Sequence, residues 1–367
     1  MIHQKNDNLD RQSRKYILAI NPGSTSTKIA LFAGQKMRWQ ESLEHADEDL
    51  ESFSGIWQQL DFRKQAIENC LQWRAVNYAD LLAVVGRGGL LKPLPGGTYL
   101  VNAQMLADAA EGKRGEHASN LGCALAEEIA KKAGVHAYVV DPISVDEFEP
   151  LARYSGHPLI ERSSLSHALN LHAAAHAAAE KLDVDYGASN FIVAHLGGGI
   201  SVAPICGGRI VDVNDASSDG PFSPERTGGL PLQAFIKICF SGRYSESEMK
   251  KFVMGNGGLS AYLGTKSAKE VEQRIATGDE RALEIYQAMA YQIAKEIGAM
   301  ATVLAGKVNA VVITGGLAKS EKLVNWIEER VHFIADVVIF PGEFEMAAMN
   351  DGVLRVLNGL EEVNIYP

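Results

Sequence analysis

Two segments of this chain, about half its length apart, share one pattern, and this repeat constrains the fold more than any other feature. Residues 17–32 can be set over residues 192–206 with Asn21 opposite His195. Each segment runs from an apolar strand through a polar residue and a glycine-rich tip into a second apolar strand. The repeat predicts two related domains, each beginning with a hairpin whose tip faces a shared cleft. The alternative is that any two hairpins look alike.

Strand-like and helix-like segments alternate along the chain, which is typical of an α/β protein. The expected strands are short and rich in β-branched residues, and several end in glycine or in a polar residue. They cover residues 16–20, 28–32, 81–89, 137–141, 191–199, 200–205, 310–316 and 337–342. The expected helices cover residues 102–112, 118–133, 164–182, 231–241, 268–276, 279–305, 319–331 and 343–358.

Charge and hydropathy exclude some classes of protein. The formal net charge is −10, which argues against a general nucleic-acid binder, because phosphate contacts need a basic face. A small anionic substrate held by a few local cations is still allowed. The most apolar long segment, residues 285–306, contains Lys295 and Glu296, so we expect a buried helix and no membrane span. Residues 1–14 are polar and mixed in charge, which predicts a disordered tail rather than a signal peptide.

Neither the cysteines nor the closely spaced histidines predict a zinc site. The cysteines lie far apart and form no CxxC pair, which favours reduced thiols in a cytoplasmic protein; they are Cys70, Cys123, Cys206 and Cys239. His172 and His176 could share a helix face, but no glutamate follows the first histidine and no third ligand is near. His117 and His167 are better candidates for a functional site.

The first hairpin tip, GSTSTK at residues 23–28, concentrates small hydrogen-bond donors. Its glycine exposes backbone N–H groups, and the hydroxyls of Ser24 and Ser26 add donors that suit phosphate oxygens. The tip lacks the second glycine of a Walker A loop before Lys28, and a strand rather than a helix follows it. We therefore interpret the tip as a phosphate-facing hairpin of a protein that is not a P-loop NTPase. A solvated turn is the alternative.

Two further glycine-rich stretches favour a nucleotide with several phosphates. The stretch HLGGG lets backbone approach a ligand closely, and its candidate residues are His195, Gly197, Gly198 and Gly199. Gly315 and Gly316 follow an expected strand and should open a helix, whose N-terminal dipole favours anions. Each stretch is a weak signal alone. Together with the first hairpin tip they make three candidate phosphate-binding stretches in one chain, which favours a nucleotide with several phosphates.

Several charged residues lie where charge is not expected. Arg87 and Arg226 stand among glycines and apolar or proline residues, so each is either a structural ion pair or a clamp on carboxylate or phosphate. Asp141 ends an expected strand and precedes a proline, and strand ends are where open α/β sheets bind ligands. Its carboxylate could hold Mg²⁺ or act as a base. Glu343 and Glu345 are further acidic candidates, with charged first-turn helix residues as the alternative.

Assembled in order, these segments resemble the acetate and butyrate kinase family over about residues 15–360. The matching motifs are NPGSTSTKIALF, GRGGLL, HASNLG, VDPISVDE, SHALN, HLGGGISV, DGPFSPERTGGLP, GGLSAYLGT, ITGG and PGEFEMAAMNDG. The first and seventh look like the butyrate kinase branch. The family is similar in fold to sugar kinases, actin and Hsc70. The resemblance therefore implies two duplicated actin/ribonuclease-H-like α/β domains, with ATP and Mg²⁺ in a central cleft.

We expect the N-terminal domain to cover residues 15–150, completed by a C-terminal helix at about 345–360. The C-terminal domain would then cover residues 151–344, with residues 1–14 as the tail. The chain departs from the family pattern at three positions. Ser163 stands where acetate kinases carry a histidine, and Ser267 and Lys269 stand where butyrate kinases usually carry aspartate and arginine.

The resemblance assigns roles to the residues already singled out. Residues implied to act at the acid or the transferred phosphoryl group are Asn21, Arg87, His117, Asp141, His167 and Arg226. Residues implied to bind the nucleotide phosphates are Ser24, Ser26, Lys28, His195, Gly197, Gly198, Gly199, Gly315 and Gly316. The implied Mg²⁺ ligands are Asp141 and one of the two late glutamates, for which we favour Glu345 over Glu343.

The implied reaction is the reversible phosphorylation of a short-chain fatty acid carboxylate by ATP, giving an acyl phosphate and ADP. Butyrate or a branched-chain analogue is the expected acid. Two alternatives stay open: a kinase of the same superfold that acts on a hydroxyl, and a non-catalytic ATP-binding regulator. The resemblance also implies a cytoplasmic homodimer whose partner is a small carboxylate, with no nucleic acid and no membrane.

Overall fold

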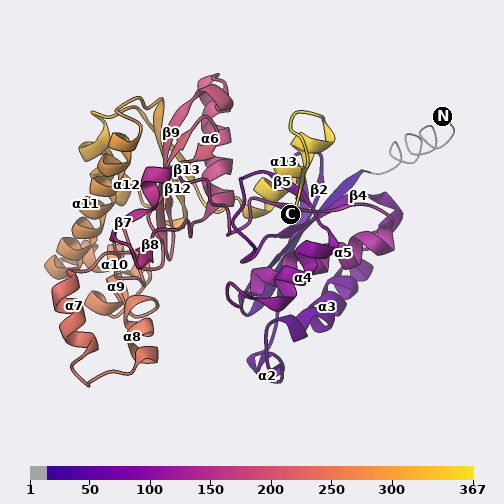
Figure 1. The fold of residues 1–367 in the computed structure, drawn as a ribbon, viewed down its shortest axis with the longest axis horizontal. Helices are drawn as coiled ribbons and strands as arrows, with labels where there is room; N and C mark the ends of the chain where they lie inside the picture. The colour runs from indigo at the N-terminus through magenta and orange to yellow at the C-terminus, as the bar shows by residue number, and fades with distance from the viewer. Residues whose placement is uncertain (1–14) are drawn as a thin grey trace. The chain divides into compact units, whose positions relative to one another are not determined.

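The computed structural model describes residues 15–367 (Figure 1), and the tail expected over residues 1–14 lies outside the described residues. Contacts divide the described chain into two compact units. Unit 1 contains residues 15–145 together with Phe344–Pro367, and unit 2 is Asp146–Glu343. The end of the chain thus returns to the unit in which it began.

Unit 1 is built on a seven-stranded mixed sheet with the order β14-β5-β6-β4-β1-β2-β3. β1 and β2 form the expected antiparallel hairpin, and β4 runs parallel to β1 on its other side. The strands are β1 (Tyr16–Pro22), β2 (Ser26–Ala33), β3 (Lys36–Glu44), β4 (Leu81–Arg87), β5 (Thr98–Leu100), β6 (Ala137–Val140) and β14 (Asn364–Ile365). The helices are α2 (Asp47–Glu51), α3 (Leu60–Trp73), α4 (Ala103–Glu111), α5 (Leu121–Ala133) and α13 (Glu345–Leu357), with 3₁₀ turns at Trp57–Gln59, Tyr78–Asp80 and Ala118–Asn120.

Helices cover both faces of this sheet, because its central strands are apolar on both sides. Leu18 and Ile20 of β1 pack with α3, α4 and α5 in one buried cluster. The alternate residue Ala19 points to the opposite face, which α13 covers through contacts with β1, β4 and β6. Two glycines allow the closest approach: a Cβ on Gly86 of β4 would lie 2.0 Å from the carbonyl oxygen of Gly122 in α5.

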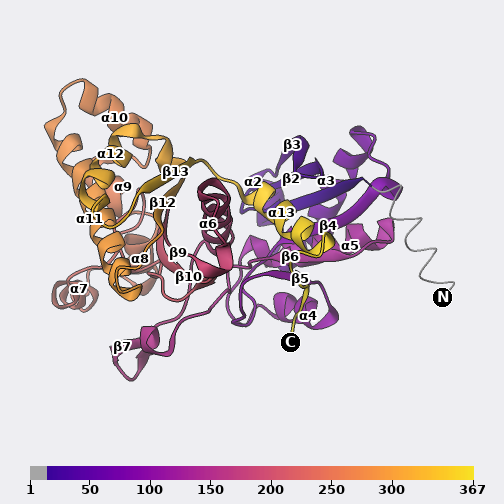
Figure 2. The same ribbon diagram turned by 90° about the horizontal axis from the view of Figure 1, so that it is seen from above.

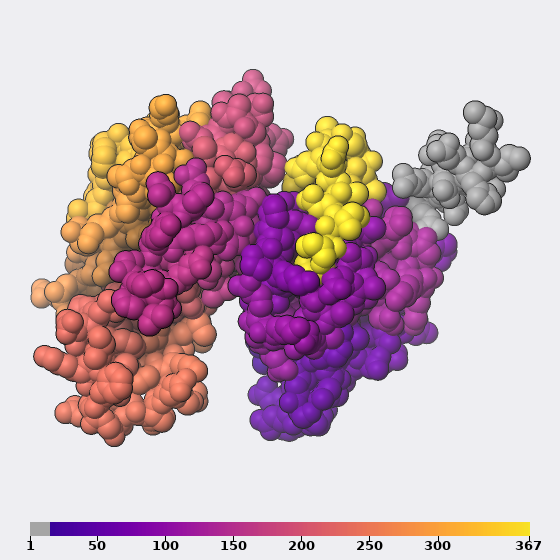
Figure 3. All heavy atoms as spheres, viewed as in Figure 1, coloured from indigo at the N-terminus to yellow at the C-terminus, as the bar shows by residue number. Residues whose placement is uncertain are grey.

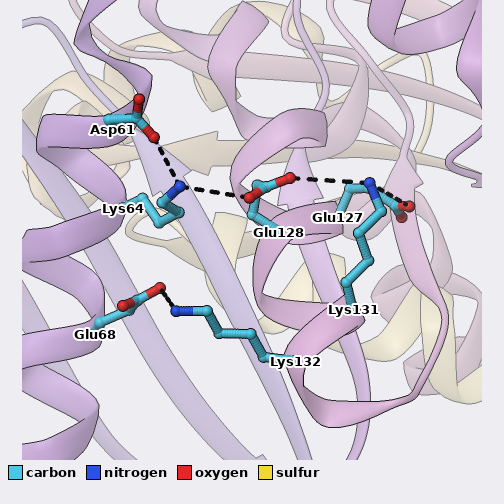
Figure 4. Close-up of polar contacts among 7 residues, drawn as sticks. All are labelled: Asp61, Lys64, Glu68, Glu127, Glu128, Lys131 and Lys132. Carbon is cyan, nitrogen blue, oxygen red and sulfur yellow. Dashed lines mark hydrogen bonds and ion pairs between the residues drawn. The ribbon is translucent and has the colours of Figure 1, made fainter.

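Ion pairs join the outer surfaces of α3 and α5 (Figure 4). Lys64 of α3 lies 3.4 Å from Glu128 of α5, and Glu68 of α3 pairs with Lys132 of α5. Such exposed pairs add little stability individually. Together with the buried Ile67 on the same helix, they fix how α3 lies against the rest of unit 1.

Unit 2 repeats the central arrangement of unit 1. Its five-stranded sheet has the order β11-β10-β9-β12-β13, in which β9 and β10 form an antiparallel hairpin and β12 runs parallel to β9. The strands are β9 (Asn190–Leu196), β10 (Ile200–Cys206), β11 (Arg209–Ile210), β12 (Ala310–Gly315) and β13 (Val337–Pro341). A separate two-stranded hairpin, β7 (Tyr154–His157) with β8 (Ile160–Glu161), projects from the unit (Figure 2).

The helices of unit 2 also cover both faces of its sheet. α11 and α12 pack in one cluster with Ile192 and Ala194 of β9, while α6 contacts β9 and β12 from the other side. The helices are α6 (Ala168–Leu182), α7 (Leu232–Cys239), α8 (Glu246–Val253), α9 (Gly258–Leu263), α10 (Ala268–Ala276), α11 (Glu280–Val303) and α12 (Glu321–Val331), with 3₁₀ turns at Pro150–Arg153, Tyr186–Ala188 and Gly316–Lys319. Within residues 15–367, no helix has the length and apolar character needed to cross a bilayer.

The α/β class and the repeated hairpin expected from the sequence are confirmed by these two sheets. Four of the helices in the described residues were not expected, namely α2, α3, α8 and α9. The helix expected over residues 164–182 begins only at Ala168. The prediction that a helix opens at the Gly315–Gly316 pair was wrong. A four-residue 3₁₀ turn follows the strand there, and α12 begins only at Glu321.

Candidate functional site

The β1–β2 tip presents its small donors at the end of the unit 1 sheet. The tip is closed by a hydrogen bond from the Gly23 N–H to the Ser26 carbonyl, at 2.8 Å. Ser24 is exposed and Ser26 is partly exposed, so both hydroxyls can reach a ligand. Lys28 lies opposite Asn21 in the ladder, with its side chain partly buried.

Asn21 is tied to the C-terminal segment of the chain. Its Nδ2 donates to Glu345 Oε2 at 2.6 Å, although 324 residues separate the two in sequence. Glu345 is the first residue of α13, where the helix dipole favours a carboxylate. Of the two late glutamates, Glu345 is therefore the one that joins the other unit 1 candidates. Glu343 is exposed at the last position of unit 2.

Arg87 lies at the centre of the unit 1 candidates. It ends β4, is almost completely buried, and donates from Nη1 to the carbonyl oxygen of Asp141 at 3.2 Å. Its Nε is 4.0 Å from Glu345 Oε1. Asp141 follows β6 with a φ of +39°, a rare conformation for a residue with a side chain, and its Oδ1 accepts from the Gly97 N–H at 2.6 Å. An observed outlier of this kind is common at ligand-binding sites.

His117 also belongs to this group. Its Nδ1 bonds Ser119 Oγ at 2.6 Å and caps the 3₁₀ turn that leads into α5. Burial, and then the positive charge of Arg87, lower the pKa of His117 below its ordinary value. The neutral imidazole is therefore the form expected near pH 7. Unit 1 brings together Asn21, Arg87, His117, Asp141 and Glu345 in this way.

In unit 2 the rings of the candidate histidines lie in contact, tilted by 33° to one another. The rings of His167 and His195 have centroids 4.5 Å apart. His167 lies just before α6 and its Nδ1 is 2.9 Å from Ser201 Oγ, while Ser201 is the ladder partner of His195 across the β9–β10 hairpin. The register of one hairpin thus places both histidines beside the HLGGG tip.

The same tip packs directly against Arg226. A Cβ on Gly199 would lie 2.2 Å from Arg226 Nη1, so any side chain there would displace the guanidinium from its observed position. Arg226 Nη1 donates to the Ala216 carbonyl at 2.7 Å, and Nε is buried with no hydrogen-bond partner among the described residues. Burial lowers the pKa of this arginine, which nevertheless stays cationic. A buried donor without a partner is suited to an anionic ligand.

Gly315 and Gly316 lie at the end of β12, next to the β9 strand of the same sheet. Gly315 has a φ of +95°, and a Cβ there would lie 2.3 Å from the Leu196 carbonyl oxygen. No atom lies within 4 Å of a Cβ built on Gly316, so that side is open. Because only a 3₁₀ turn of four residues follows, the expected dipole of a long helix is not present at this glycine pair.

Of the three positions that depart from the family pattern, Ser267 has a local structural role. Ser267 caps α10 by accepting from the Glu270 N–H at 3.3 Å. Lys269 and Ser163 are exposed.

The two closely spaced histidines of α6, His172 and His176, both contact Tyr186. His172 does so through a hydrogen bond at 2.8 Å, and the ring of His176 stacks on the tyrosine ring with centroids 3.6 Å apart.

One residue close to the candidates was missed by the sequence analysis. Arg63 of α3 is fully buried and donates to the backbone of the β1–β2 tip. A helix pattern with an arginine on its inner face is a poor signal for a buried helix, so nothing in the sequence pointed to it. Taken unit by unit, the candidates of unit 1 are a cation, small donors and two carboxylates, and those of unit 2 are a cation and a glycine-rich backbone. Such groups suit phosphoryl transfer, in which charge is neutralised and the reactants are positioned.

Comparisons with known proteins give this arrangement a class. The structure has the fold of acetate and propionate kinases: it resembles a Porphyromonas gingivalis acetate kinase with a TM-score of 0.77, at 17% identity, over 92% of this chain and 99% of that one. A Francisella tularensis propionate kinase gives a TM-score of 0.72 at 17% identity, over 92% of this chain and 98% of that one.

Sequence relatives narrow the class further. Residues 165–334 match the model of the acetokinase family. A probable butyrate kinase from Listeria welshimeri is 49% identical over 95% of this chain and 99% of its own length. A butyrate kinase 2 from Clostridium acetobutylicum is likewise 49% identical over 95% of this chain. The chain belongs to the acetokinase family, as the sequence motifs indicated, and it is an ATP-dependent carboxylate kinase.

Proposed function

We propose that the protein transfers the γ-phosphoryl group of ATP reversibly to a short-chain fatty acid, butyrate or a branched-chain analogue, forming an acyl phosphate and ADP. The observation that carries this choice of acid is the 49% identity, over nearly the whole chain, to relatives named butyrate kinase. No feature of the described residues favours a hydroxyl substrate or a purely regulatory role.

The chemistry fits the charges that the site offers. A short-chain carboxylate is already ionised near pH 7, so it needs no general base before it attacks phosphorus. The obstacle is the approach of two anions, which cations and backbone donors must offset. In the proposal Arg87 holds the acid carboxylate against the phosphoryl group, and Asn21, Ser24 and Ser26 donate to the phosphoryl oxygens.

The groups of unit 2 are proposed to act on the nucleotide phosphates and the developing charge. Arg226 would donate its unpartnered Nε to a phosphoryl oxygen. The backbone of Gly197, Gly198 and Gly199 allows phosphate to approach because it has no side chains. His167, His195, Gly315 and Gly316 are proposed to complete this set, as is Lys28 from unit 1.

Mg²⁺ is part of the proposal, and the residues present fit it. Asp141 uses Oδ1 for the Gly97 N–H, while among the described residues none donates to its Oδ2. Glu345 supplies a second carboxylate within the same group. Mg²⁺ is usually bound by one or two carboxylates with the substrate phosphates, so two carboxylates are enough. When bound, the ion neutralises phosphate charge.

The substitution Asp141→Asn tests this assignment. The amide would keep an oxygen acceptor for Gly97, and asparagine tolerates a positive φ, so the fold should be retained. The lost charge should raise the Mg²⁺ concentration needed for half-maximal activity by about tenfold or more, since the loss of even an outer-shell partner typically costs about 10–100-fold in metal affinity. A titration of MgCl₂ at fixed ATP measures this. An unchanged Mg²⁺ dependence would remove Asp141 as a ligand.

An endpoint assay tests the function itself. Purified protein is incubated with Mg-ATP and acetate, propionate, butyrate, isobutyrate or valerate, and hydroxylamine traps any acyl phosphate as a hydroxamate. We expect the signal to peak at four or five carbons. A maximum at acetate would overturn the choice of acid, and no signal with any acid, despite ATP binding, would contradict the proposed reaction.

The proposal also includes a cytoplasmic homodimer. All four cysteines lie within the described residues and are free thiols, which suits a reducing compartment. Support for a dimer comes from the exposed apolar residues of α7, which has no buried residue.

A further inference from the structure

The β1–β2 tip is held from behind by one arginine. Arg63, on α3, has an exposure of 0%. Its Nη1 donates to the carbonyls of Gly23 and Ser26 at 2.8 and 3.0 Å, and its Nη2 donates to the Ser24 carbonyl at 3.0 Å. Nη1 also lies 3.1 Å from Thr27 Oγ1. Four of the five residues from Gly23 to Thr27 are therefore fixed by a single guanidinium.

Neighbouring side chains orient the guanidinium. Gln59 Oε1 accepts from Arg63 Nε at 3.0 Å and from Nη2 at 2.8 Å, which fixes the plane of the fork. Thr27 Oγ1, which accepts from Arg63, is 2.9 Å from His45 Nε2. Burial, and then the charge of Arg63, lower the pKa of His45, so the neutral ring can accept a hydrogen bond from the threonine hydroxyl. The backbone N–H of His45 donates in turn to the Thr25 carbonyl.

The direction of these bonds determines what the tip offers on its other side. A peptide group is planar, and its N–H points opposite to its C=O. Because the Gly23 and Ser24 carbonyls point toward Arg63, the N–H groups of Ser24 and Thr25 point away from it. Those N–H groups lie beside the exposed Ser24 and Thr25 side chains. The arginine therefore turns backbone donors toward the side from which a phosphate would bind.

The charge of Arg63 is also unusual. A buried arginine is normally paired with a carboxylate, because an unpaired buried cation is costly. Among residues 15–367 no carboxylate forms an ion pair with Arg63, and its acceptors are the neutral oxygens of Gln59, Thr27 and the tip carbonyls. Its positive charge is thus uncompensated behind the tip. A neutral donor would be enough if Arg63 only linked α3 to the tip. The positive charge additionally favours an anion bound on the side of the tip that faces away from Arg63.

We propose that Arg63 is a positioning residue for phosphoryl transfer: it holds the tip with its N–H groups outward and leaves a positive charge behind the phosphate. This rests on the proposed function, in which the tip receives the transferred phosphoryl group. Arg63 touches neither substrate. It acts through residues 23–27, and its loss should reduce turnover without weakening the binding of groups far from the tip.

Two substitutions separate the charge from the fork. Arg63→Met removes both, and Arg63→Lys keeps the charge but can satisfy fewer carbonyls. We expect kcat to fall about 100-fold or more for Arg63→Met, because a misplacement of the tip donors by about 1 Å costs about that much in rate. For Arg63→Lys we expect a fall of about 10-fold. The KM for the acid should stay within about twofold of wild type in both variants. The matched control is Ile67→Ala, which removes a buried side chain from the same helix one turn later and should lower the melting temperature while leaving kcat within about twofold.

Two readouts distinguish positioning from general loss of structure. Hydrogen exchange of peptides covering residues 21–28 should accelerate in Arg63→Met and not in Ile67→Ala at equal distance from the melting temperature. If Arg63→Met does not fold, Gln59→Leu serves instead, because it removes the acceptor that orients the fork and leaves the bonds from Arg63 to the tip in place. We expect a fall in kcat of about 3- to 10-fold, smaller than for Arg63→Met, because the tip keeps its own hydrogen bonds to the guanidinium.

The outcomes are distinct from those of the function assay. Full kcat in Arg63→Met, or equal losses in Ile67→Ala and Arg63→Met, would overturn the positioning role while leaving the carboxylate kinase intact. If the wild-type protein forms no acyl phosphate, the exchange experiment still reports whether Arg63 orders the tip. Unchanged exchange in both Arg63→Met and Gln59→Leu would refute the ordering of the tip by Arg63.

Discussion

Gly199 lies where any larger residue would displace the guanidinium of Arg226. The backbone of Gly199 is not left-handed, so alanine would be tolerated by φ, but its Cβ would lie 2.2 Å from Arg226 Nη1 and 2.6 Å from Cζ. The guanidinium would have to move. We therefore expect Gly199→Ala to lower kcat/KM by about 100-fold, comparable to the loss of one charge-stabilising donor. Steady-state kinetics with ATP and butyrate measure this.

The control for Gly199→Ala is Gly298→Ala in α11, where a Cβ would meet no atom within 4 Å. That variant should retain wild-type kinetics, because Gly298 is outside the candidate site. If Gly199→Ala also retained wild-type kinetics, the close packing of the tip on Arg226 would be irrelevant to turnover, and Arg226 would lose its proposed role.

Glu296 of α11 gives the protein a dependence of stability on pH. Burial raises the pKa of its carboxyl from 4.5 to about 7, with repulsion from Asp219 and Asp212 adding to the effect and Arg162 and Lys295 opposing it. The folded state thus binds the proton more tightly than the unfolded state. This contribution to stability is complete below about pH 4.5 and is lost as the pH rises to about 7.

Replacement of Glu296 by glutamine should remove this part of the pH dependence. We expect Glu296→Gln to be more stable than wild type at pH 8 by about 1–3 kcal/mol, with a smaller difference at pH 5. Urea unfolding at both pH values measures it. Glu284→Gln, on the exposed side of the same helix, is the control and should show no such difference. Equal stabilities of Glu296→Gln and wild type at pH 8 would contradict the assignment.

Among the elements, α13 packs very closely on the unit 1 sheet, and this packing brings Glu345 to Asn21. A Cβ on Gly352 would lie 2.6 and 2.9 Å from the two methyl carbons of Val140 in β6. Alanine is the better helix former, by about 0.8–1.0 kcal/mol, but here overpacking should outweigh that gain. We expect Gly352→Ala to destabilise the protein by about 1–3 kcal/mol.

Chemical denaturation checks the prediction for α13. Gly298→Ala again provides the comparison, since it is a helical glycine in open space and should stabilise the protein by about 0.5–1 kcal/mol. A stabilising effect of Gly352→Ala would mean that α13 does not pack on β6 as closely as the structure shows.

The helices and strands differed in how well they could be predicted from the sequence. The central strands were predictable because they are short apolar runs, and α11 because it is long and strongly periodic. α3 was missed because its inner face carries Arg63 and Cys70 among the apolar residues. The segment after Gly315 was wrongly given to a helix, since a glycine pair fits an α-helix start and a 3₁₀ turn equally well.

At the scale of the whole molecule, α7 and its surroundings point to self-association. The segment that carries α7 and α8 forms an outer lobe of unit 2 (Figures 1 and 3). Leu232 and Phe240 there are 71% and 87% exposed, and exposed apolar groups of this kind mark interaction sites. We expect the wild-type protein to be a homodimer, and Phe240→Asp to shift it toward monomer by at least tenfold in dissociation constant, about 1.4 kcal/mol.

Light scattering coupled to size exclusion measures the oligomeric state. Phe333→Asp is the matched control, because Phe333 is the same residue type, 78% exposed, and outside the α7–α8 lobe. A wild-type protein that is monomeric at micromolar concentration would contradict the dimer. Equal effects of the two variants would show that this lobe is not the interface.

Strand alternation and glycine spacing are local properties, so the α/β class, the duplicated hairpins and the positions of the glycine-rich tips could be predicted from the sequence. It also identified the family. The folded structure was needed to see that Glu345 rather than Glu343 contacts Asn21, and that Arg63 holds the tip, since these pairs are 324 and 40 residues apart in sequence. Contacts between distant residues depend on how helices pack on a sheet, and local patterns in one sequence do not reveal that packing.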